Sequence, residues 1–140
     1  MTAGRRVSIA SLAAAAVLAA GAGPGRATTT VEFRATFSEF PCGATFCGTG
    51  VVAQVGRASI LFTTLIFTPP CEFNAMITVA GGTLTETHGC LGEKGGPFTV
   101  TGGTGVFTGA RGGGTVNCPN FKPALARDTR CLYNGTLTLP

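Results

Sequence analysis

The sequence has few of the side chains that build metal centres and hydrolytic active sites. His88 is the only histidine, Asp128 is the only aspartate, and no two of the six cysteines are separated by just two residues. A structural zinc site needs several Cys and His ligands at short spacings, and a Ser-His-Asp triad needs an aspartate that reaches the histidine. Because Asp128 is far from His88 in the sequence, we expect neither a bound metal nor a triad hydrolase.

A long apolar run is also missing after the N-terminal segment. Residues 1–27 contain Arg5 and Arg6, an apolar run over residues 7–20, and small residues up to Ala27. This order is typical of a cleaved secretory signal peptide, and the run is shorter than the ~20 residues that span a bilayer. We therefore predict a signal peptide over 1–27, one domain over 28–140 and secretion to the extracellular space; an uncleaved anchor is the alternative.

Positive charge is scarce in the predicted domain. Three of the ten Lys and Arg residues lie in residues 1–27, whereas all six Asp and Glu residues lie outside them, so residues 28–140 have a net charge of +1. Nucleic acids and anionic membranes are bound by clustered basic residues. We expect neither as a partner of the cleaved protein.

All six cysteines follow the leader, and an even number of cysteines in an exported chain predicts disulfides. Six cysteines allow 15 pairings. We expect the local pairing, in which each bridge closes a hairpin or a short loop: Cys42–Cys47, Cys71–Cys90 and Cys118–Cys131.

Helical periodicity is nearly absent after the leader, and short runs rich in Thr, Val, Phe, Ile and Leu alternate with Gly and Pro. This pattern is typical of an all-β domain. Eight strands in so short a chain predict a small antiparallel β-barrel or a sandwich. The run 58–67 is apolar on both faces, so a terminus or loop covers it or a partner, such as a second copy, binds it. The predicted strands are 30–37, 48–55, 58–67, 71–79, 83–91, 97–102, 113–118 and 131–139.

One hairpin register follows from a disulfide. If Cys71 and Cys90 are opposed, Phe73 faces His88, Ala75 faces Glu86 and Ile77 faces Leu84, and residues 79–82 form the loop. These residues share one mainly apolar face, while the other face is polar, so the bridge and the alternation agree. By the same reasoning, the bridge Cys118–Cys131 sets Val116 opposite Tyr133.

The segment 99–116, TVTGGTGVFTGARGGGTV, does not bind phosphate. A dinucleotide-binding loop needs G-x-G-x-x-G between a strand and a helix, but Thr108 stands at the position of the third glycine and strand-like sequence follows. No Gly-Lys-Ser/Thr triplet of a P-loop occurs either. As β-structure, residues 102–105 form a turn, Phe107 returns to the core, and the other glycines allow tight bending. We expect no nucleotide cofactor.

The string GGTGVFTGARGGGTV, residues 102–116, resembles the strand-turn-strand signature of dirigent proteins and allene oxide cyclases, and more closely that of small secreted bacterial proteins of that barrel type. The resemblance implies an eight-stranded antiparallel β-barrel with a central cavity. In the plant members, the cavity holds an apolar or phenolic ligand and directs a cyclisation or coupling without a cofactor. The resemblance transfers no catalytic residue to this chain.

Two titratable residues, Glu86 and His88, share the apolar face of the predicted hairpin. A carboxylate and an imidazole in a cavity are candidates for acid–base catalysis or for binding a polar ligand group; a solvated or internally satisfied pair is the alternative. Candidate ligand-binding residues are Phe73, Ala75, Tyr133 and Arg111. Tyr133 is alternatively a core residue, and Arg111 alternatively bonds a neighbouring carbonyl.

Three functions are compatible with these features. The first is a secreted β-barrel that binds a small hydrophobic molecule in its lumen. The second is a cofactor-free cyclase or isomerase in which Glu86 or His88 transfers the proton. The third is an extracellular interaction module that pairs with another subunit through residues 58–67.

Overall fold

The computed structural model describes residues 27–119 and 129–140. The predicted signal peptide lies outside them except for Ala27, and so does Asp128. Within the described ranges, no helical segment has the length and hydropathy needed to cross a membrane.

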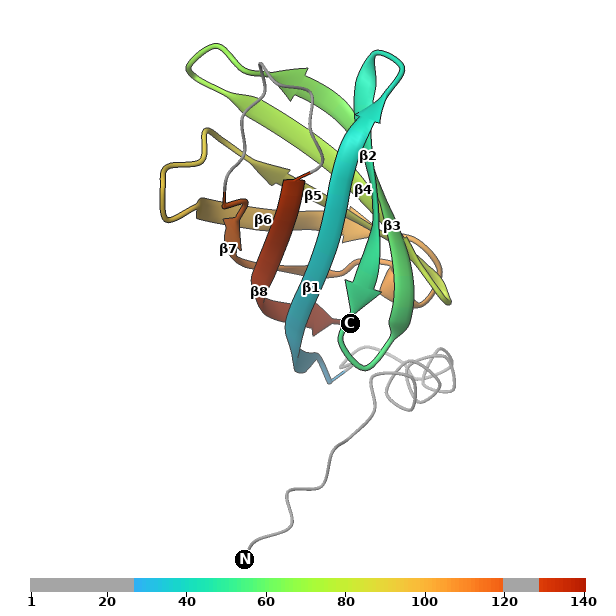
Figure 1. The fold of residues 1–140 in the computed structure, drawn as a ribbon. Helices are drawn as coiled ribbons and strands as arrows, with labels where there is room; N and C mark the ends of the chain where they lie inside the picture. The colour runs from blue at the N-terminus through green and yellow to red at the C-terminus, as the bar shows by residue number, and fades with distance from the viewer. Residues whose placement is uncertain (1–26, 120–128) are drawn as a thin grey trace, which may run out of the picture.

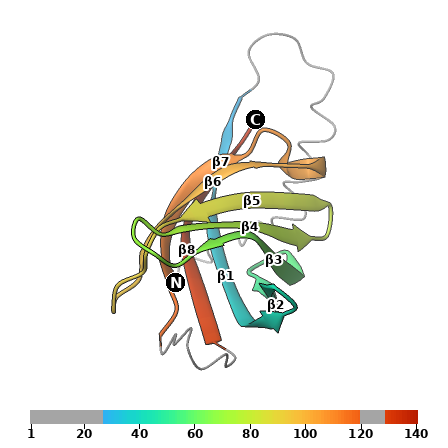
Figure 2. The same cartoon turned by 90° about the horizontal axis from the view of Figure 1, so that it is seen from above.

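Eight antiparallel strands form a closed barrel in which each strand pairs with its neighbours in sequence and β8 pairs with β1 (Figures 1 and 2). The predicted all-β class is confirmed, and of the two predicted architectures the barrel is correct. The strands are β1 Thr29–Cys42, β2 Thr45–Val52, β3 Gly56–Ile66, β4 Glu72–Val79, β5 Gly82–His88, β6 Gly96–Gly103, β7 Arg111–Asn117 and β8 Thr129–Leu139.

Strand β1 is longer than the sequence pattern predicted. It continues past Phe37 to Cys42 and pairs with β2 up to the register pair Cys42↔Thr45. Its inward side therefore includes Glu39, which is 5% exposed. This extension places a carboxylate inside the barrel.

The β4–β5 hairpin has the predicted register. Phe73 pairs with His88, Ala75 with Glu86 and Ile77 with Leu84, all on the inward face. The predicted four-residue loop is wrong, because Val79 and Gly82 already form a register pair and only residues 80–81 remain in the turn. The ladder therefore extends one pair further than the alternation of side chains indicated.

The glycine-rich segment is β-structure with a compact turn, as predicted, but the turn lies later in the chain. Residues 102 and 103 still belong to β6, and a 3-10 turn, Gly105–Phe107, comes before β7. Gly105 has φ +61°, and a Cβ there would lie 2.1 Å from the carbonyl oxygen of Gly81. Only glycine allows the two turns to approach so closely. Phe107 is 3% exposed and packs in the core, as expected.

The two ends of the barrel differ. β1, β3, β5 and β7 end where β2, β4, β6 and β8 begin, and all three disulfides lie at this end. We call it the disulfide end. The opposite end, which we call the turn end, carries the turns 53–55, 80–81 and 104–110 and the end of the β1–β8 ladder at which Thr29 pairs with Leu139.

The outer face of β3 is only partly apolar. Ile60 and Phe62 point inward and are buried, whereas Leu61 and Ile66 are 38% and 44% exposed on the outside. A β-bulge between Phe62 and Thr64 shifts the register and moves Ile66 to that outer side. Within residues 27–119 and 129–140, no loop or terminus buries these two side chains.

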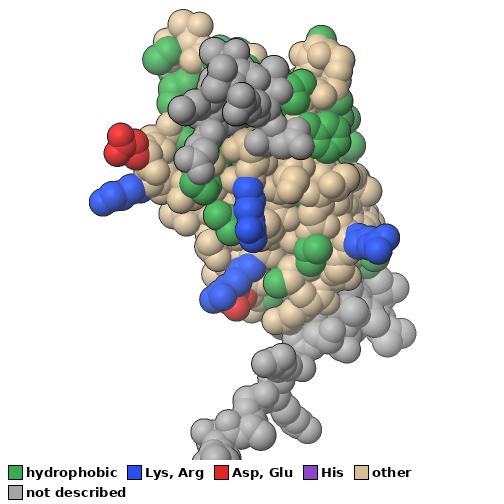
Figure 3. All heavy atoms as spheres, viewed as in Figure 1, with side chains coloured by type: hydrophobic (Ala, Val, Ile, Leu, Met, Phe, Trp, Pro, Cys, Tyr) green, Lys and Arg blue, Asp and Glu red, His purple; other side chains and the backbone are tan. Residues whose placement is uncertain are grey.

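Charged side chains are sparse on the barrel surface. Figure 3 shows a few Lys and Arg side chains spread from one edge of the visible face to the other. Arg34 and Glu32 form an exposed pair, with Nη2 and Oε1 2.6 Å apart, as the outward alternation of β1 predicts.

Candidate functional site

A cavity of about 270 Å³ opens at the disulfide end of the barrel. Its lining combines strand residues near the ends of β1, β3, β4 and β5 with residues of the neighbouring loops and β2. The lining residues are Glu39, Phe46, Phe62, Leu65, Phe67, Cys71, Phe73, His88, Cys90, Leu91 and Cys118.

Aromatic rings form much of the cavity wall. The ring centroids of Phe67 and Phe73 lie 5.1 Å apart in an edge-to-face arrangement, and Phe46 contacts Phe67 at 6.5 Å. His88 stacks on Phe73 at 5.1 Å and meets Phe62 edge-on at 6.2 Å. The imidazole is thus held between two phenyl rings, which fixes its orientation.

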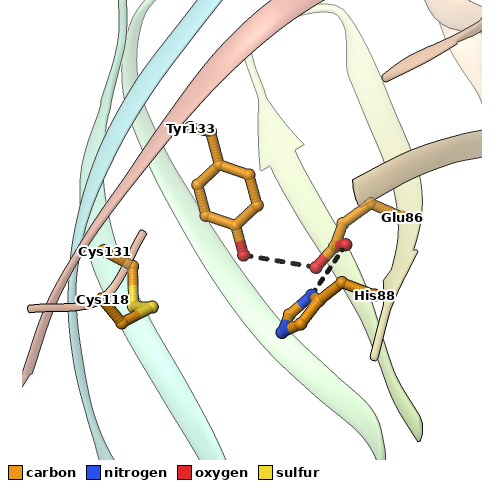
Figure 4. The surroundings of a disulfide bond; sticks show 5 residues. All are labelled: Glu86, His88, Cys118, Cys131 and Tyr133. Atoms are coloured by element: carbon orange, nitrogen blue, oxygen red, sulfur yellow. Dashed lines mark hydrogen bonds and ion pairs between the residues drawn. A yellow bond between two sulfur atoms is a disulfide. The ribbon is translucent and has the colours of Figure 1, made fainter. Parts of the chain in front are cut away.

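Glu86, His88 and Tyr133 form a buried polar cluster (Figure 4). His88 Nδ1 lies 3.1 Å from Glu86 Oε2, and the Tyr133 hydroxyl donates to Glu86 Oε1 at 3.3 Å. Both carboxylate oxygens therefore have a partner. Figure 4 shows the second ring nitrogen of His88 directed away from Glu86. His88 lines the cavity and Glu86 does not, so Glu86 contacts the imidazole from behind the cavity wall.

Glu39 is a second buried carboxylate, and it lines the cavity. One of its oxygens lies within 4.8 Å of the sulfurs of Cys118 and Cys131. Its Oε1 is buried, and so is the hydroxyl of Thr129, its register partner on β8; neither atom has a hydrogen-bond partner among the described residues. A buried polar atom without a partner costs free energy unless a ligand or water satisfies it.

Burial and the nearby Glu86 charge raise the pKa of Glu39 from 4.5 to about 8. Glu39 is therefore mostly a neutral carboxylic acid at pH 7. Burial also raises the pKa of Tyr133 well above 10, with contributions from the charges of Glu86 and Glu39 and from the hydrogen bond to Glu86. Tyr133 stays a hydrogen-bond donor at every physiological pH.

The sequence analysis did not identify Glu39 as a site residue, although a signal was present. Every second residue of β1 points inward at Phe33, Ala35 and Phe37, and the next residue in this alternation is Glu39. Phe40 obscures this pattern. An aromatic residue there makes it unclear from the sequence whether Glu39 or Phe40 points into the barrel.

The structure brings together most of the predicted site residues. Phe73 and His88 line the cavity, and Glu86 and Tyr133 lie directly behind His88. Ala75 is buried opposite Glu86 but does not line the cavity. Arg111 is exposed at the turn end, where its Nη1 donates to the carbonyls of Thr101 at 2.6 Å and Ala110 at 2.8 Å. That contact matches the alternative role of Arg111 and separates it from the cavity.

The disulfides have the predicted local pairing. Cys71, Cys90 and Cys118 line the cavity, so two of the three bridges form part of its wall. The sulfurs next to Glu39 belong to the bridge Cys118–Cys131, so they are not thiolates that could bind a metal ion with this carboxylate.

No family model matches the sequence, and no curated protein matches it. Among solved structures, the pterocarpan synthase dirigent protein GePTS1 is similar over 84% of this chain and 89% of its own, with a TM-score of 0.58 and 13% identity. A pyocyanin demethylase is similar over 78% of this chain and 99% of its own, with a TM-score of 0.42 and 15% identity. The likeness to the dirigent structure, together with the closed eight-stranded antiparallel topology, shows that this chain has a dirigent-like β-barrel fold.

Proposed function

We propose that the protein binds a small, mainly apolar molecule in the cavity at the disulfide end. The observation that carries this proposal is a cavity of about 270 Å³ walled by Phe and Leu side chains and disulfides, in which Glu39 and His88 are the ionisable lining residues. Ligand sites are typically apolar pockets with a few polar groups that orient the ligand. The volume is near the lower end of the usual range of roughly 300–1,000 Å³, which suits a molecule of one or two rings.

A second candidate function is a cofactor-free cyclase or isomerase, and the protonation of Glu39 favours it. Glu39, an acid with a pKa of about 8, can donate a proton near neutral pH, and the imidazole of His88 lines the same apolar cavity. The catalytic pair is then Glu39 and His88, with Glu86 as a positioning residue. The printed name of GePTS1 assigns it a pterocarpan synthase activity, which is compatible with catalysis in such a barrel. Glu39→Gln separates the two functions, since an enzyme loses turnover while a binder keeps apolar ligands.

We also propose that the protein is exported. Three disulfides and no free cysteine among the described residues suit an oxidising compartment. Residues 1–27 would act as the signal peptide, and mass spectrometry of protein recovered from the culture medium of its host tests this by the N-terminal residue that it finds.

The binding function is tested by filling the cavity. Leu91 lines the cavity from the loop after Cys90, so Leu91→Trp occupies part of its volume. Val51→Trp is the matched control, because Val51 is 53% exposed on the outer face of β2. Isothermal titration calorimetry with 2-naphthol should show binding to the wild type and to Val51→Trp, and at least tenfold weaker binding to Leu91→Trp.

The sequence contains no tryptophan, so each variant carries a single one, whose emission reports whether the indole ring is enclosed or in water. Equal 2-naphthol affinities of the two variants, with the indole of Leu91→Trp enclosed, would contradict binding in this cavity. Absence of binding by 2-naphthol and by other apolar molecules of similar size would refute the proposed function.

A further inference from the structure

We propose that the ligand carries a positively charged amino group that pairs with Glu39, so that the cavity selects an aromatic or alkyl ammonium ion over neutral and anionic molecules of the same shape. This inference rests on the proposed function and specifies the chemistry of its ligand. It follows from an unpaired carboxylate, from the charges around that carboxylate and from the rings of the cavity wall.

The first observation is the state of Glu39. It is 5% exposed, it lines the cavity, and its Oε1 has no hydrogen-bond partner among the described residues. Glu86 differs, because Tyr133 and His88 occupy both of its oxygens. Glu39 is thus the cavity-lining carboxylate that has an unpartnered oxygen, whereas Glu86 is already satisfied by the protein.

The second observation is the charge balance. No Lys or Arg is among the residues that line the cavity in the described part of the chain. Of the arginines on β1 and β8, the two strands that carry Glu39 and its register partner, Arg34 bonds the exposed Glu32 and Arg130 is exposed. When Glu39 is ionised it is repelled by the Glu86 carboxylate, so a cation in the cavity would favour the ionised form of Glu39, whereas an anion would disfavour it.

The third observation is the cavity wall. Phe46, Phe62, Phe67 and Phe73 all line the cavity. The face of an aromatic ring attracts a cation through its quadrupole, and the attraction is stronger where water is excluded. Several phenyl rings with one carboxylate therefore form a suitable environment for an ammonium group and the apolar body attached to it.

The protonation of Glu39 gives the inference a measurable signature. The groups around Glu39 are the carboxylate of Glu86 on β5, the hydroxyls of Tyr133 and Thr129 on β8, the imidazole of His88 in the wall of the same cavity, and the bridge Cys118–Cys131. Apart from the imidazole, none of these groups can carry positive charge. With a pKa of about 8, Glu39 is about nine-tenths protonated at pH 7. An ammonium ligand needs the ionised form, so binding releases close to one proton from Glu39 to the buffer, and no covalent bond between heavy atoms changes.

Three probes of the same shape test the charge preference: benzylammonium, benzyl alcohol and benzoate. Calorimetry at pH 7 should show that benzylammonium binds at least tenfold more tightly than benzyl alcohol and that benzoate binds most weakly. Titrations in phosphate and Tris buffers, which differ in ionisation enthalpy, should give close to one proton released for benzylammonium and none for benzyl alcohol. The benzylammonium affinity should rise nearly tenfold from pH 6 to pH 7, because ionised Glu39 becomes nearly tenfold more abundant.

Glu39→Gln should remove the preference for benzylammonium and the proton release, while benzyl alcohol still binds. Glu72→Gln, at an exposed carboxylate on β4, is the matched control and should change neither. Proton release by the wild type does not depend on how well Glu39→Gln folds. If benzyl alcohol binds as tightly as benzylammonium and no proton is released, the ammonium preference is refuted and the proposed function stands. If none of the three probes binds, the ammonium preference is refuted, and the proposed function is refuted with it when 2-naphthol also fails to bind.

Discussion

The two ends of the barrel are built from the same strands but bury different kinds of side chain. The buried side chains near the turn end, Val79, Phe107, Ala110 and Leu139, are all apolar. Every buried polar or charged side chain of the described residues lies toward the disulfide end instead: Glu39, Glu86, His88 and Thr129. A barrel of this size can thus close one end by packing and keep a cavity with buried polar side chains at the other.

Each end is stabilised by its own kind of interaction. At the turn end, two turns interlock: Val106 N–H donates to the carbonyl of Gly81 at 3.0 Å, and Thr104 N–H donates to that of Thr83 at 2.9 Å. At the disulfide end, an unfilled cavity forfeits packing contacts. Covalent bridges there tie β1 to β2, the residue before β4 to the loop after β5, and the residue after β7 to β8. We infer that the bridges compensate for the stability that is lost where the cavity leaves side chains without packing contacts.

The largest effect should come from a cavity created at the turn end. Phe107→Ala removes a ring that is 3% exposed, so we expect the free energy of unfolding to fall by about 3–5 kcal/mol. Ligand affinity should not change, because Phe107 does not line the cavity. Phe46→Ala is the matched change at the disulfide end. It should destabilise the protein less, since Phe46 is only partly buried, but it should weaken ligand binding.

Chemical denaturation and calorimetry on both variants measure these two quantities. A loss of ligand affinity in Phe107→Ala that equals the loss in Phe46→Ala would show that the two ends do not act separately.

Removal of a bridge should have the next largest effect, and the bridges should differ in what else they change. Replacing Cys118 and Cys131 by Ala should cost about 3 kcal/mol, and replacing Cys42 and Cys47 about 2 kcal/mol, because the closed loops span 13 and 5 residues. Ligand affinity should fall only in the first variant, since Cys118 lines the cavity and neither Cys42 nor Cys47 does. Equal ligand affinities in the two double variants would refute a role of the Cys118–Cys131 bridge in the cavity wall.

The sequence predicted the fold well where two independent signals agreed. In the β4–β5 hairpin, the alternation of inward residues and the spacing of Cys71 and Cys90 favoured one register, and the structure has it. The tight turn there could not be read from alternation, because Gly82 has no side chain to show that it still belongs to the strand. Local rules thus located the strands but not the residues at which they end.

The candidate site was predicted only in part, for a related reason. Glu86 and His88 were found because they interrupt an apolar face, but Glu39 lies beyond the point where the pattern of β1 becomes ambiguous. Its proximity to Glu86 comes from the curvature of the closed sheet, which brings β1 and β5 to one cavity. Arg111 was predicted as a ligand-binding residue because it follows a glycine turn. The sequence does not indicate that this turn lies at the end of the barrel opposite the cavity.

The smallest effect should be the pH dependence that Glu39 gives to the free energy of unfolding. Its pKa is about 8 in the folded protein against an ordinary value of 4.5, so between these values the unfolded chain has lost a proton that the folded chain keeps. Stability must then fall as the pH rises through this window, by about 1.4 kcal/mol per pH unit at most, and level off below 4.5 and above 8. The turn end contributes nothing to this slope, since its buried residues do not titrate.

Denaturant unfolding at pH 6 and pH 7 should therefore show a decrease of about 1 kcal/mol in the wild type that is absent in Glu39→Gln and kept in Glu72→Gln. Subtracting the Glu39→Gln curve from the wild-type curve isolates Glu39, because Glu86 and His88 are present in both proteins. If the free energy of unfolding depends on pH equally in the wild type and in Glu39→Gln, a group other than Glu39 is responsible for that dependence. A wild-type curve that is flat between pH 6 and pH 7 and matches that of Glu39→Gln would mean that a cation already neutralises Glu39 in the free protein, because the pKa of Glu39 would then not be raised.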